Sequence, residues 1–219
     1  MGVLGERGVR VLSHRGYWKA PAERNSIEAF DRSFALGFGT ELDIRDLDGM
    51  LTVSHDPPRA GALAAHAVFE IMAGHDPGLT LAVNIKADGL QASLVDMLMQ
   101  AGLLDVFVFD MSVPDTLHWL NTGIPVFVRH SDIEPEPVLY PEASGIWLDA
   151  FKSEWWGEET LVRHFNAGKR VCIVSPELHR RDHRPLWERL LGMDVLSSEA
   201  LMICTDFPEE AARVFRHGD

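Results

Sequence analysis

Residues 40–56 read TELDIRDLDGMLTVSHD and gather several groups that could do chemistry within one expected hairpin. Glu41 and Asp43 are two positions apart, so on a strand both side chains project from the same face. Two carboxylates on one face could bridge a divalent cation. His55 follows the second apolar run, and an imidazole titrates near neutral pH, which suits acid–base catalysis. The segment therefore combines a candidate cation site with a candidate proton-transfer group.

The length of the turn decides which residues of the returning strand lie opposite the two acids. A two-residue loop at positions 48–49 would pair His55 with Leu42 and place the imidazole on the wrong face. A three-residue loop at positions 47–49, with its glycine in the left-handed bulge position, would put His55 opposite Glu41. We predict the three-residue loop, because only this register gathers both carboxylates and the imidazole on one face.

Polar side chains recur at the ends of the apolar runs throughout the chain. They are His14-Arg15, Glu41 with Asp43, His55-Asp56, Asn84 with Lys86, Asp110, Arg129-His130, Asp149, Ser175 with Glu177, and Asp206. If the runs are parallel strands of one barrel, these groups collect at a single face, where the loops after the strands build the active site. Glu177 and Asp206 are expected to orient neighbouring groups rather than to react.

The elements that would position these groups alternate along the chain. Short apolar runs predict strands at residues 9–14, 39–44, 51–55, 79–86, 106–111, 124–130, 145–151, 170–175 and 201–206. Amphipathic periodicity predicts helices at 26–37, 61–74, 89–102, 114–123, 158–168, 183–192 and 208–217. This alternation favours a parallel sheet with right-handed crossovers, most simply an α/β fold closed into a compact TIM (β/α)8 barrel. An open doubly wound sheet is the alternative, and we expect one domain over residues 1–219.

The charge balance limits the partners of the protein. Lys and Arg number 20 against 33 Asp and Glu, a net charge of −13, so the surface as a whole repels nucleic acid and anionic membranes. An anionic substrate would need a local positive site. Cys172 and Cys204 lie in apolar runs and are expected to be buried thiols rather than metal ligands or a disulfide.

The N-terminal residues MGVLGERGVR lack the apolar core of a signal peptide, and the myristoylation pattern fails at Glu6. No stretch approaches the roughly 18 apolar residues that a membrane helix needs. We therefore expect a cytoplasmic protein without stable membrane insertion and without a nucleic-acid partner.

Several motifs resemble those of the glycerophosphodiester phosphodiesterase family, within the barrel superfamily that includes bacterial phosphatidylinositol-specific phospholipases C. They are HRG at 14–16, NSIEAF at 25–30, ELD at 41–43, HD at 55–56, VNIK at 83–86 and TDFP at 205–208. Their order and spacing over residues 12–57 are specific, and the later motifs add Lys86 and TDFP. The resemblance implies a barrel that cleaves a phosphodiester.

The resemblance also implies a role for each matching residue: acid–base catalysis by His14 and His55, metal binding by Glu41 and Asp43, and phosphate binding by Arg15 and Lys86. The family's metal is usually Mg²⁺ or Ca²⁺, and hard carboxylate oxygens favour these ions over Zn²⁺. Cleaving a phosphodiester needs a base for the attacking hydroxyl, an acid for the leaving alkoxide and positive charge around the phosphoryl oxygens. The implied residues would supply all three.

Two positions depart from the family pattern. Asn84 stands where the family usually has a glutamate two residues before the strand-end lysine, and Arg24 stands where another glutamate is expected. A metal held by Glu41, Asp43 and the amide oxygen of Asn84 should bind more weakly than one held by three carboxylates. The family's capping insertion is reduced here to residues 57–67, so the pocket should be more open.

We expect a metal-dependent phosphodiester hydrolase that acts on a glycerophosphodiester or a related small or lipid-derived phosphodiester through two histidines. The alternative is a catalytically weak barrel that binds a phosphorylated ligand without turnover, because negative charge is lost at Asn84 and Arg24. A metal-dependent sugar isomerase or aldolase would need more histidine and carboxylate ligands at later strand ends, although fold alone does not separate these activities.

Overall fold

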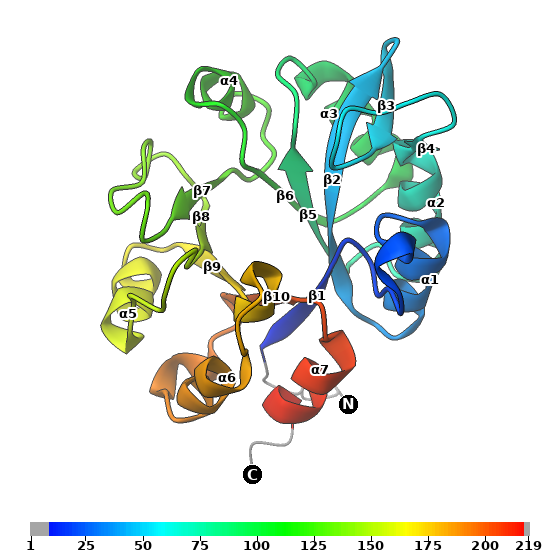
Figure 1. The fold of residues 1–219 in the computed structure, drawn as a ribbon. Coiled ribbons are helices and arrows are strands. Elements are labelled where there is room, and N and C mark those ends of the chain that lie inside the picture. Colours follow the sequence, from blue (N-terminus) through cyan, green and yellow to red (C-terminus); the bar gives the residue numbers. More distant parts are fainter. Residues whose placement is uncertain (1–8, 217–219) are drawn as a thin grey trace, which may run out of the picture.

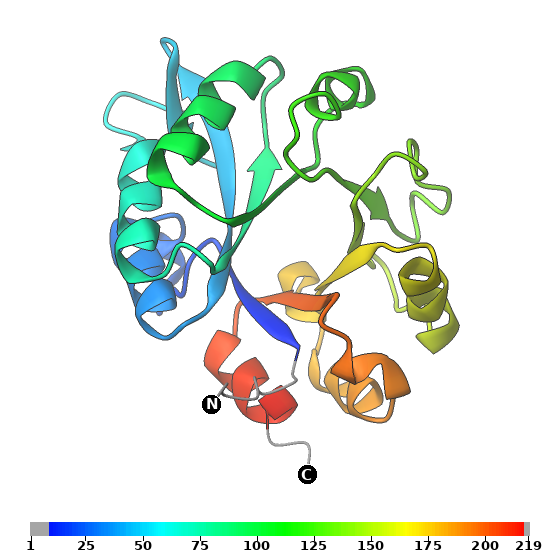
Figure 2. The same cartoon turned by 180° about the vertical axis from the view of Figure 1, so that it is seen from behind.

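The computed structural model describes residues 9–216, in which eight parallel strands close into a ring (Figures 1 and 2). In ring order they are β1 (Arg10–His14), β2 (Gly39–Leu47), β5 (Thr80–Ile85), β6 (Asp105–Phe109), β7 (Phe127–His130), β8 (Gly145–Leu148), β9 (Arg170–Val174) and β10 (Leu201–Thr205). Strand β1 pairs with β10, which closes the barrel. The predicted TIM barrel is confirmed, and the open doubly wound sheet is not.

Helices cover the outside of the ring and follow the strands in turn. They are α1 (Ile27–Ala35), α2 (Ala65–His75), α3 (Gln91–Ala101), α4 (Val113–Trp119), α5 (Glu158–Asn166), α6 (Arg184–Leu191) and α7 (Pro208–Arg216), with 3-10 helices η1 (Pro21–Glu23), η2 (Pro176–His179) and η3 (Asp194–Ser197). The side chains of Ser26 and Ser112 cap α1 and α4 by accepting hydrogen bonds from backbone N–H groups. Between β7 and β8 the described chain forms a loop over residues 131–144 instead of a helix.

All nine predicted strands and all seven predicted helices are present, with ends that differ by a few residues. The two-residue strand β4 (Leu63–Ala64) was not predicted, because it is too short to show a periodic pattern. Within residues 9–216, no helix combines the length and the apolar character that crossing a bilayer requires. The N-terminal residues on which the signal-peptide and myristoylation predictions rest lie mainly outside the described part of the chain.

Large side chains fill the interior of the barrel. The rings of Phe107 and Phe127 stack with centroids 3.8 Å apart, and those of Phe109 and Trp147 stack at 3.9 Å. A Cβ atom at Gly145 would lie 2.4 Å from the Phe127 ring, so this close packing requires glycine. Because the interior is packed, polar chemistry is confined to the end of the barrel where the strands terminate.

Both cysteines are buried free thiols, as predicted. Burial raises the pKa of the Cys172 and Cys204 thiols well above their ordinary range. They act as small apolar groups in the barrel wall.

The hairpin between β2 and β3 (Met50–Val53) has a two-residue turn, so the predicted three-residue loop is wrong. Leu47 pairs with Met50, and Asp48 and Gly49 both have positive φ, 53° and 79°. Two successive left-handed residues form the hairpin turn whose twist matches that of the strands, and an Asp-Gly pair accommodates it readily. In this register His55 does not come opposite Glu41.

A hydrogen-bonded chain of neutral side chains fastens the loop that replaces the missing helix. His130 Nε2 lies 3.0 Å from the carbonyl oxygen of Pro135, so this nitrogen donates. His130 Nδ1 then accepts from His164 Nε2 at 3.0 Å, and His164 Nδ1 accepts from the Tyr140 hydroxyl at 2.9 Å. Burial, and then the neighbouring His130, Arg163 and Lys169, lower the pKa of His164 to about 4. Both imidazoles must therefore be neutral in this arrangement.

This cluster predicts a pH dependence of folding. In the unfolded chain His164 takes up a proton at its ordinary pKa of 6.5, whereas in the folded protein it does so only near 4. The contribution of neutral His164 to the free energy of unfolding is therefore complete above pH 6.5 and is lost as the pH falls toward 4. From this residue alone, proton linkage predicts that the free energy of unfolding falls by about 2 kcal/mol between about pH 7 and about pH 5. Urea unfolding of His164→Gln should show a flatter pH profile than the wild type. The exposed His118→Gln serves as the matched control, and an unchanged slope in His164→Gln would contradict the assignment.

Candidate active site

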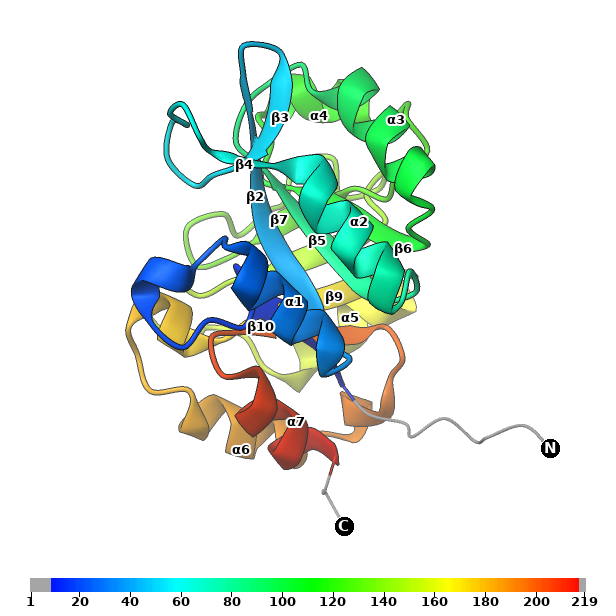
Figure 3. The same cartoon turned by 90° about the vertical axis from the view of Figure 1, so that its right-hand side faces the viewer.

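Parallel register brings the predicted site residues of neighbouring strands to the same end of the barrel. His14 lies beside Glu41 in the ladder between β1 and β2, and Asp43 lies beside Asn84 in the ladder between β2 and β5. Arg15 and Lys86 follow directly after β1 and β5. In the side view of Figure 3, the loops after β1 and β3, drawn in dark blue and cyan, extend on this side of the barrel.

The carboxylate of Asp43 is fully buried and is the centre of the site. Its Oδ2 lies 3.0 Å from Arg15 Nε and accepts a hydrogen bond from Asn25 Nδ2 at 3.0 Å. Its Oδ1 lies 3.6 Å from Lys86 Nζ. Arg15 and Asn25 both adopt positive φ, near 60°, and the Asn25 N–H donates to the Arg15 carbonyl oxygen, so this loop is shaped to face Asp43.

Glu41 is also buried and lies next to Asp43. Its side chain accepts hydrogen bonds from the Arg15 backbone N–H at 3.2 Å and from Asn84 Nδ2 at 3.4 Å. Burial, and then the charge of Asp43, raise the pKa of Glu41 to about 7, while nearby positive groups oppose this shift. Near neutral pH the protonated and ionised forms of the Glu41 carboxyl group are therefore both populated.

Three buried side-chain oxygens here have no hydrogen-bond partner among the described residues: Asn25 Oδ1, Asp43 Oδ1 and Asn84 Oδ1. Such orphaned acceptors are costly unless something occupies the space beside them. Hard oxygens of this kind are the ligands that Mg²⁺ and Ca²⁺ take, so the residues present fit a divalent cation. The candidate ligands are carboxylate and amide oxygens. Among residues 9–216, no group of three or more His, Cys, Asp or Glu side chains is arranged around a possible metal position.

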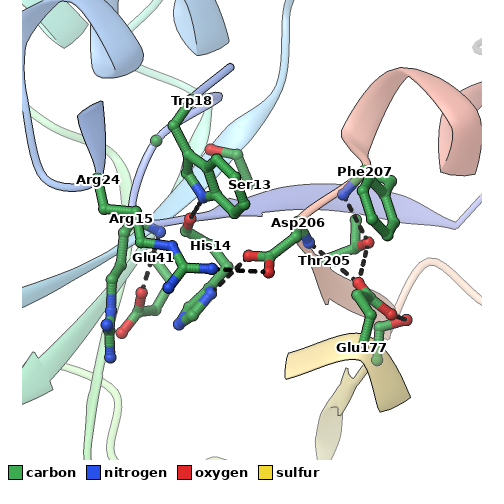
Figure 4. Close-up of polar contacts among 12 residues, drawn as sticks. Ser13, His14, Arg15, Trp18, Arg24, Glu41, Glu177, Thr205, Asp206 and Phe207 are labelled. Carbon is green, nitrogen blue, oxygen red and sulfur yellow. Dashed lines mark hydrogen bonds and ion pairs between the residues drawn. The ribbon is translucent and has the colours of Figure 1, made fainter. Parts of the chain in front are cut away.

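His14 is held by a carboxylate that directly follows the last barrel strand (Figure 4). Its Nδ1 lies 2.7 Å from Asp206 Oδ1, and because a carboxylate only accepts, Nδ1 carries the proton. The Trp18 indole donates to the His14 carbonyl oxygen at 3.1 Å, which fixes the backbone. His14 Nε2 is then the nitrogen left to accept a proton.

Asp206 is itself positioned from two sides. Its backbone N–H donates to Glu177 Oε1 at 3.0 Å, and its Oδ2 lies 3.3 Å from Arg24 Nη2 (Figure 4). The Arg24 guanidinium also lies 4.3 Å from the centre of the Trp18 ring. In the sequence, Arg24 stood out only because it replaces an expected glutamate. In the structure, its positive charge stabilises Asp206.

His55 lies beyond the end of β3, and its side chain is about half exposed, at 49%. Its Nδ1 lies 2.8 Å from Asp56 Oδ1, so the imidazole has a carboxylate partner of the same kind as His14. Among the contacts of the described residues, none joins the His55 ring to His14, Glu41 or Asp43. Arg45, which the sequence did not single out, donates to the carbonyl oxygens of His55 at 3.0 Å and Lys86 at 2.8 Å, and so ties the two loops together.

A second polar network spans the opposite side of the barrel mouth. Arg129 contacts Asp110 and Asp149, and His179 Nε2 lies 2.6 Å from Asp149 Oδ1. Lys86 Nζ lies 4.0 Å from Asp110 Oδ2, which links this network to Asp43. His179 belongs to η2, a short turn that gave no signal in the sequence.

The raised pKa of Glu41 can be measured directly. In a chelated sample, a ¹³C NMR titration of the glutamate carboxyl groups should show Glu41 titrating near 7, and Asp43→Asn should lower that value because it removes a neighbouring negative charge. A Glu41 signal that titrates at the ordinary glutamate pKa of 4.5 would contradict the burial argument.

Solved structures with the same architecture include two glycerophosphodiester phosphodiesterases. The enzyme from Agrobacterium tumefaciens has a TM-score of 0.69 at 18% identity, over 94% of this chain and 98% of that one. The enzyme from Parabacteroides distasonis has a TM-score of 0.66 at 15% identity, over 97% and 87%. A Ca²⁺-dependent phosphatidylinositol-specific phospholipase C from Streptomyces antibioticus has a TM-score of 0.60 at 10% identity, over 95% and 96%.

No family model matches the sequence, and a search of curated proteins finds no match. At these low identities the similarity establishes the fold alone. The chain therefore has a barrel fold similar to that of glycerophosphodiester phosphodiesterases and of a phosphatidylinositol-specific phospholipase C, as its sequence motifs predicted.

Proposed function

We propose that this protein is a metal-dependent phosphodiester hydrolase that acts on a glycerophosphodiester or a related small or lipid-derived phosphodiester. The observation that carries the proposal is the arrangement of His14, with Nδ1 bonded to Asp206, beside the buried acids and the positive groups around Asp43. The similarity to solved phosphodiesterases supports it at the level of the fold.

In this proposal, Arg15 and Lys86 would bind the phosphate. Both side chains are about one-fifth exposed, so each touches buried Asp43 while still reaching the open mouth of the barrel. Arg15 can grip phosphate with two parallel hydrogen bonds, whereas Lys86 acts as a movable point charge. A substrate phosphate would thus compete with Asp43 for these two cations.

Glu41, Asp43 and Asn84 would hold a Mg²⁺ or Ca²⁺ ion, with the orphaned Asn25 oxygen close by. When bound, the ion would supply positive charge to the phosphoryl oxygens and would compensate the charge of Asp43. Arg15 and Lys86 would then be available to the phosphate instead of to Asp43. The cation and the anionic substrate would therefore favour each other's binding.

Two histidines would move the protons. His14 and His55 each direct Nδ1 to a carboxylate, which leaves Nε2 on each ring for the reaction. One Nε2 removes the proton from water, or from a neighbouring substrate hydroxyl, as the new P–O bond forms. The other gives its proton to the departing alkoxide as the old P–O bond breaks, so the two rings exchange protonation states in each cycle.

A barrel that binds a phosphorylated ligand without turnover is the second candidate. It is favoured by the two positions where negative charge is lost, Asn84 and Arg24, since the first weakens cation binding and the second places a guanidinium beside Asp206. Product release from a phosphodiester separates the two candidates, because the binder gives none.

Replacing either histidine tests the mechanism. His14→Ala and His55→Ala should each lower kcat for a glycerophosphodiester by roughly 10²- to 10⁴-fold, because each removes one proton-transfer group. His118→Ala, at an exposed helix position, serves as the control. Activity is followed by the released alcohol, and circular dichroism checks the fold. Wild-type kcat in both His14→Ala and His55→Ala would rule out the two-histidine mechanism.

Metal dependence is tested separately. EDTA should abolish turnover, and Ca²⁺ or Mg²⁺ should raise Tm, because the cation binds only the folded site. Asn84→Asp should lower the activating metal concentration by about tenfold, corresponding to about 1.4 kcal/mol from an added carboxylate ligand. Asn84→Ala should raise it. If the wild type, Asn84→Asp and Asn84→Ala all need the same metal concentration for activation, Asn84 is not a metal ligand.

A further inference from the structure

The barrel wall is incomplete at one place. Seven of the eight neighbouring strand pairs are joined by continuous parallel ladders. Within residues 9–216, the backbones of β6 and β7 are joined only by a bridge between Val108 and Val126, just before β7, and by the N–H of Val108, which donates to the Pro125 carbonyl oxygen. Toward the mouth the gap between them is spanned by side chains, where Arg129 Nε donates to Asp110 Oδ1 at 3.1 Å.

A groove of about 620 Å³ lies at this opening, between α4 and the first part of the loop over residues 131–144. Its volume is in the range of sites that hold small ligands. Among its lining residues, Val113 is 50% exposed and Ile133 and Val138 are each 56% exposed. Apolar groups are thus presented to solvent on both walls, at the one place in the ring where a loop takes the position of a helix.

The groove adjoins the proposed phosphate site through Asp110. Asp110 lines its inner end, and Asp110 Oδ2 lies 4.0 Å from Lys86 Nζ. The same Lys86 nitrogen lies 3.6 Å from Asp43. A ligand whose phosphate contacts Lys86 would reach the groove past the side chain of Asp110.

We propose that this groove binds the apolar chain of the substrate, so that the preferred substrate is a phosphodiester in which one alcohol carries an alkyl or acyl chain. This inference rests on the proposed function and names the substrate class of that site. Because the groove adjoins Lys86 through Asp110, we expect a ligand that carries a phosphate and an apolar chain in one molecule. The rim residues Glu134 and Glu136 favour an uncharged chain, because a second anionic group there would be repelled.

Chain length is the variable that tests the groove. The kcat/KM of the wild type is compared for glycerophosphocholine and for derivatives acylated on the glycerol with chains of increasing length, all below their micelle concentrations. Each added methylene should raise kcat/KM by about fourfold until the groove is filled, the fold-change that corresponds to about 0.8 kcal/mol for one buried CH₂. The chain-free substrate provides the reference for every protein tested.

Two variants place polar groups in the groove from different parts of the loop. Ile133→Asp and Val138→Ser should each flatten the dependence on chain length, measured as the ratio of kcat/KM for acylated and chain-free substrates. Met99→Ser, at a 73% exposed position on α3 that does not line the groove, is the matched control and should keep the wild-type ratio. Both loop positions are more than half exposed, so the variants should fold.

Binding of alkyl phosphonates, which are not hydrolysed, separates the groove from the reaction. Calorimetry should show one site whose affinity for the phosphonate rises with chain length and falls in Ile133→Asp. If no phosphodiester is cleaved but this pattern holds, the proposed hydrolase fails while the groove stands. Turnover of the chain-free substrate with no gain from added chain overturns the groove alone.

Two further results would also overturn the groove. The first is a chain-length gain that is equal in Ile133→Asp, Val138→Ser and Met99→Ser, which would mean that the chain binds elsewhere. The second is a wild-type dimer that Ile133→Asp dissociates, which would mean that a second copy of the chain covers this face. Sedimentation velocity measures the latter.

Discussion

The burial of the Asp43 carboxylate is the constraint on which the candidate site depends. A fully buried charge is unfavourable unless other groups compensate it, and Asp43 is compensated by Arg15, Lys86 and Asn25. These three come from different segments, so satisfying one carboxylate brings the ends of β1 and β5 and the turn before α1 together. In the proposed function, Arg15 and Lys86 would bind the substrate phosphate once another group compensates Asp43.

The fold and much of the site could be predicted because their signals are local and periodic. Apolar runs with strand composition alternate with helical periodicity, and this pattern is directly readable along the chain. In a parallel barrel all strands end at one face, so polar residues at the ends of apolar runs must approach one another. The structure places Glu41, Asp43, Asn84, Arg15 and Lys86 in one connected network for this reason.

Other features could not be predicted because tertiary contacts or backbone preferences decide them. The hairpin turn was assigned from the chemistry that its register would allow, whereas the readiness of Asp48 and Gly49 to adopt positive φ determines the loop. The role of Arg24 depends on Asp206, which is 182 residues away in the sequence. The sparse pairing between β6 and β7 and the packing of the loop over residues 131–144 depend on tertiary contacts, of which periodicity gives no sign.

The central claim is that one end of the barrel brings a cation site and a phosphate site into contact around Asp43. A crystal structure of the protein with Ca²⁺ and inorganic phosphate tests it most directly. The account predicts a calcium ion bound by oxygens of Glu41, Asp43 and Asn84, with the phosphate touching that ion, Arg15 and Lys86. A calcium ion elsewhere, or a phosphate that leaves the Arg15–Asp43 ion pair intact and binds away from Lys86, would contradict it.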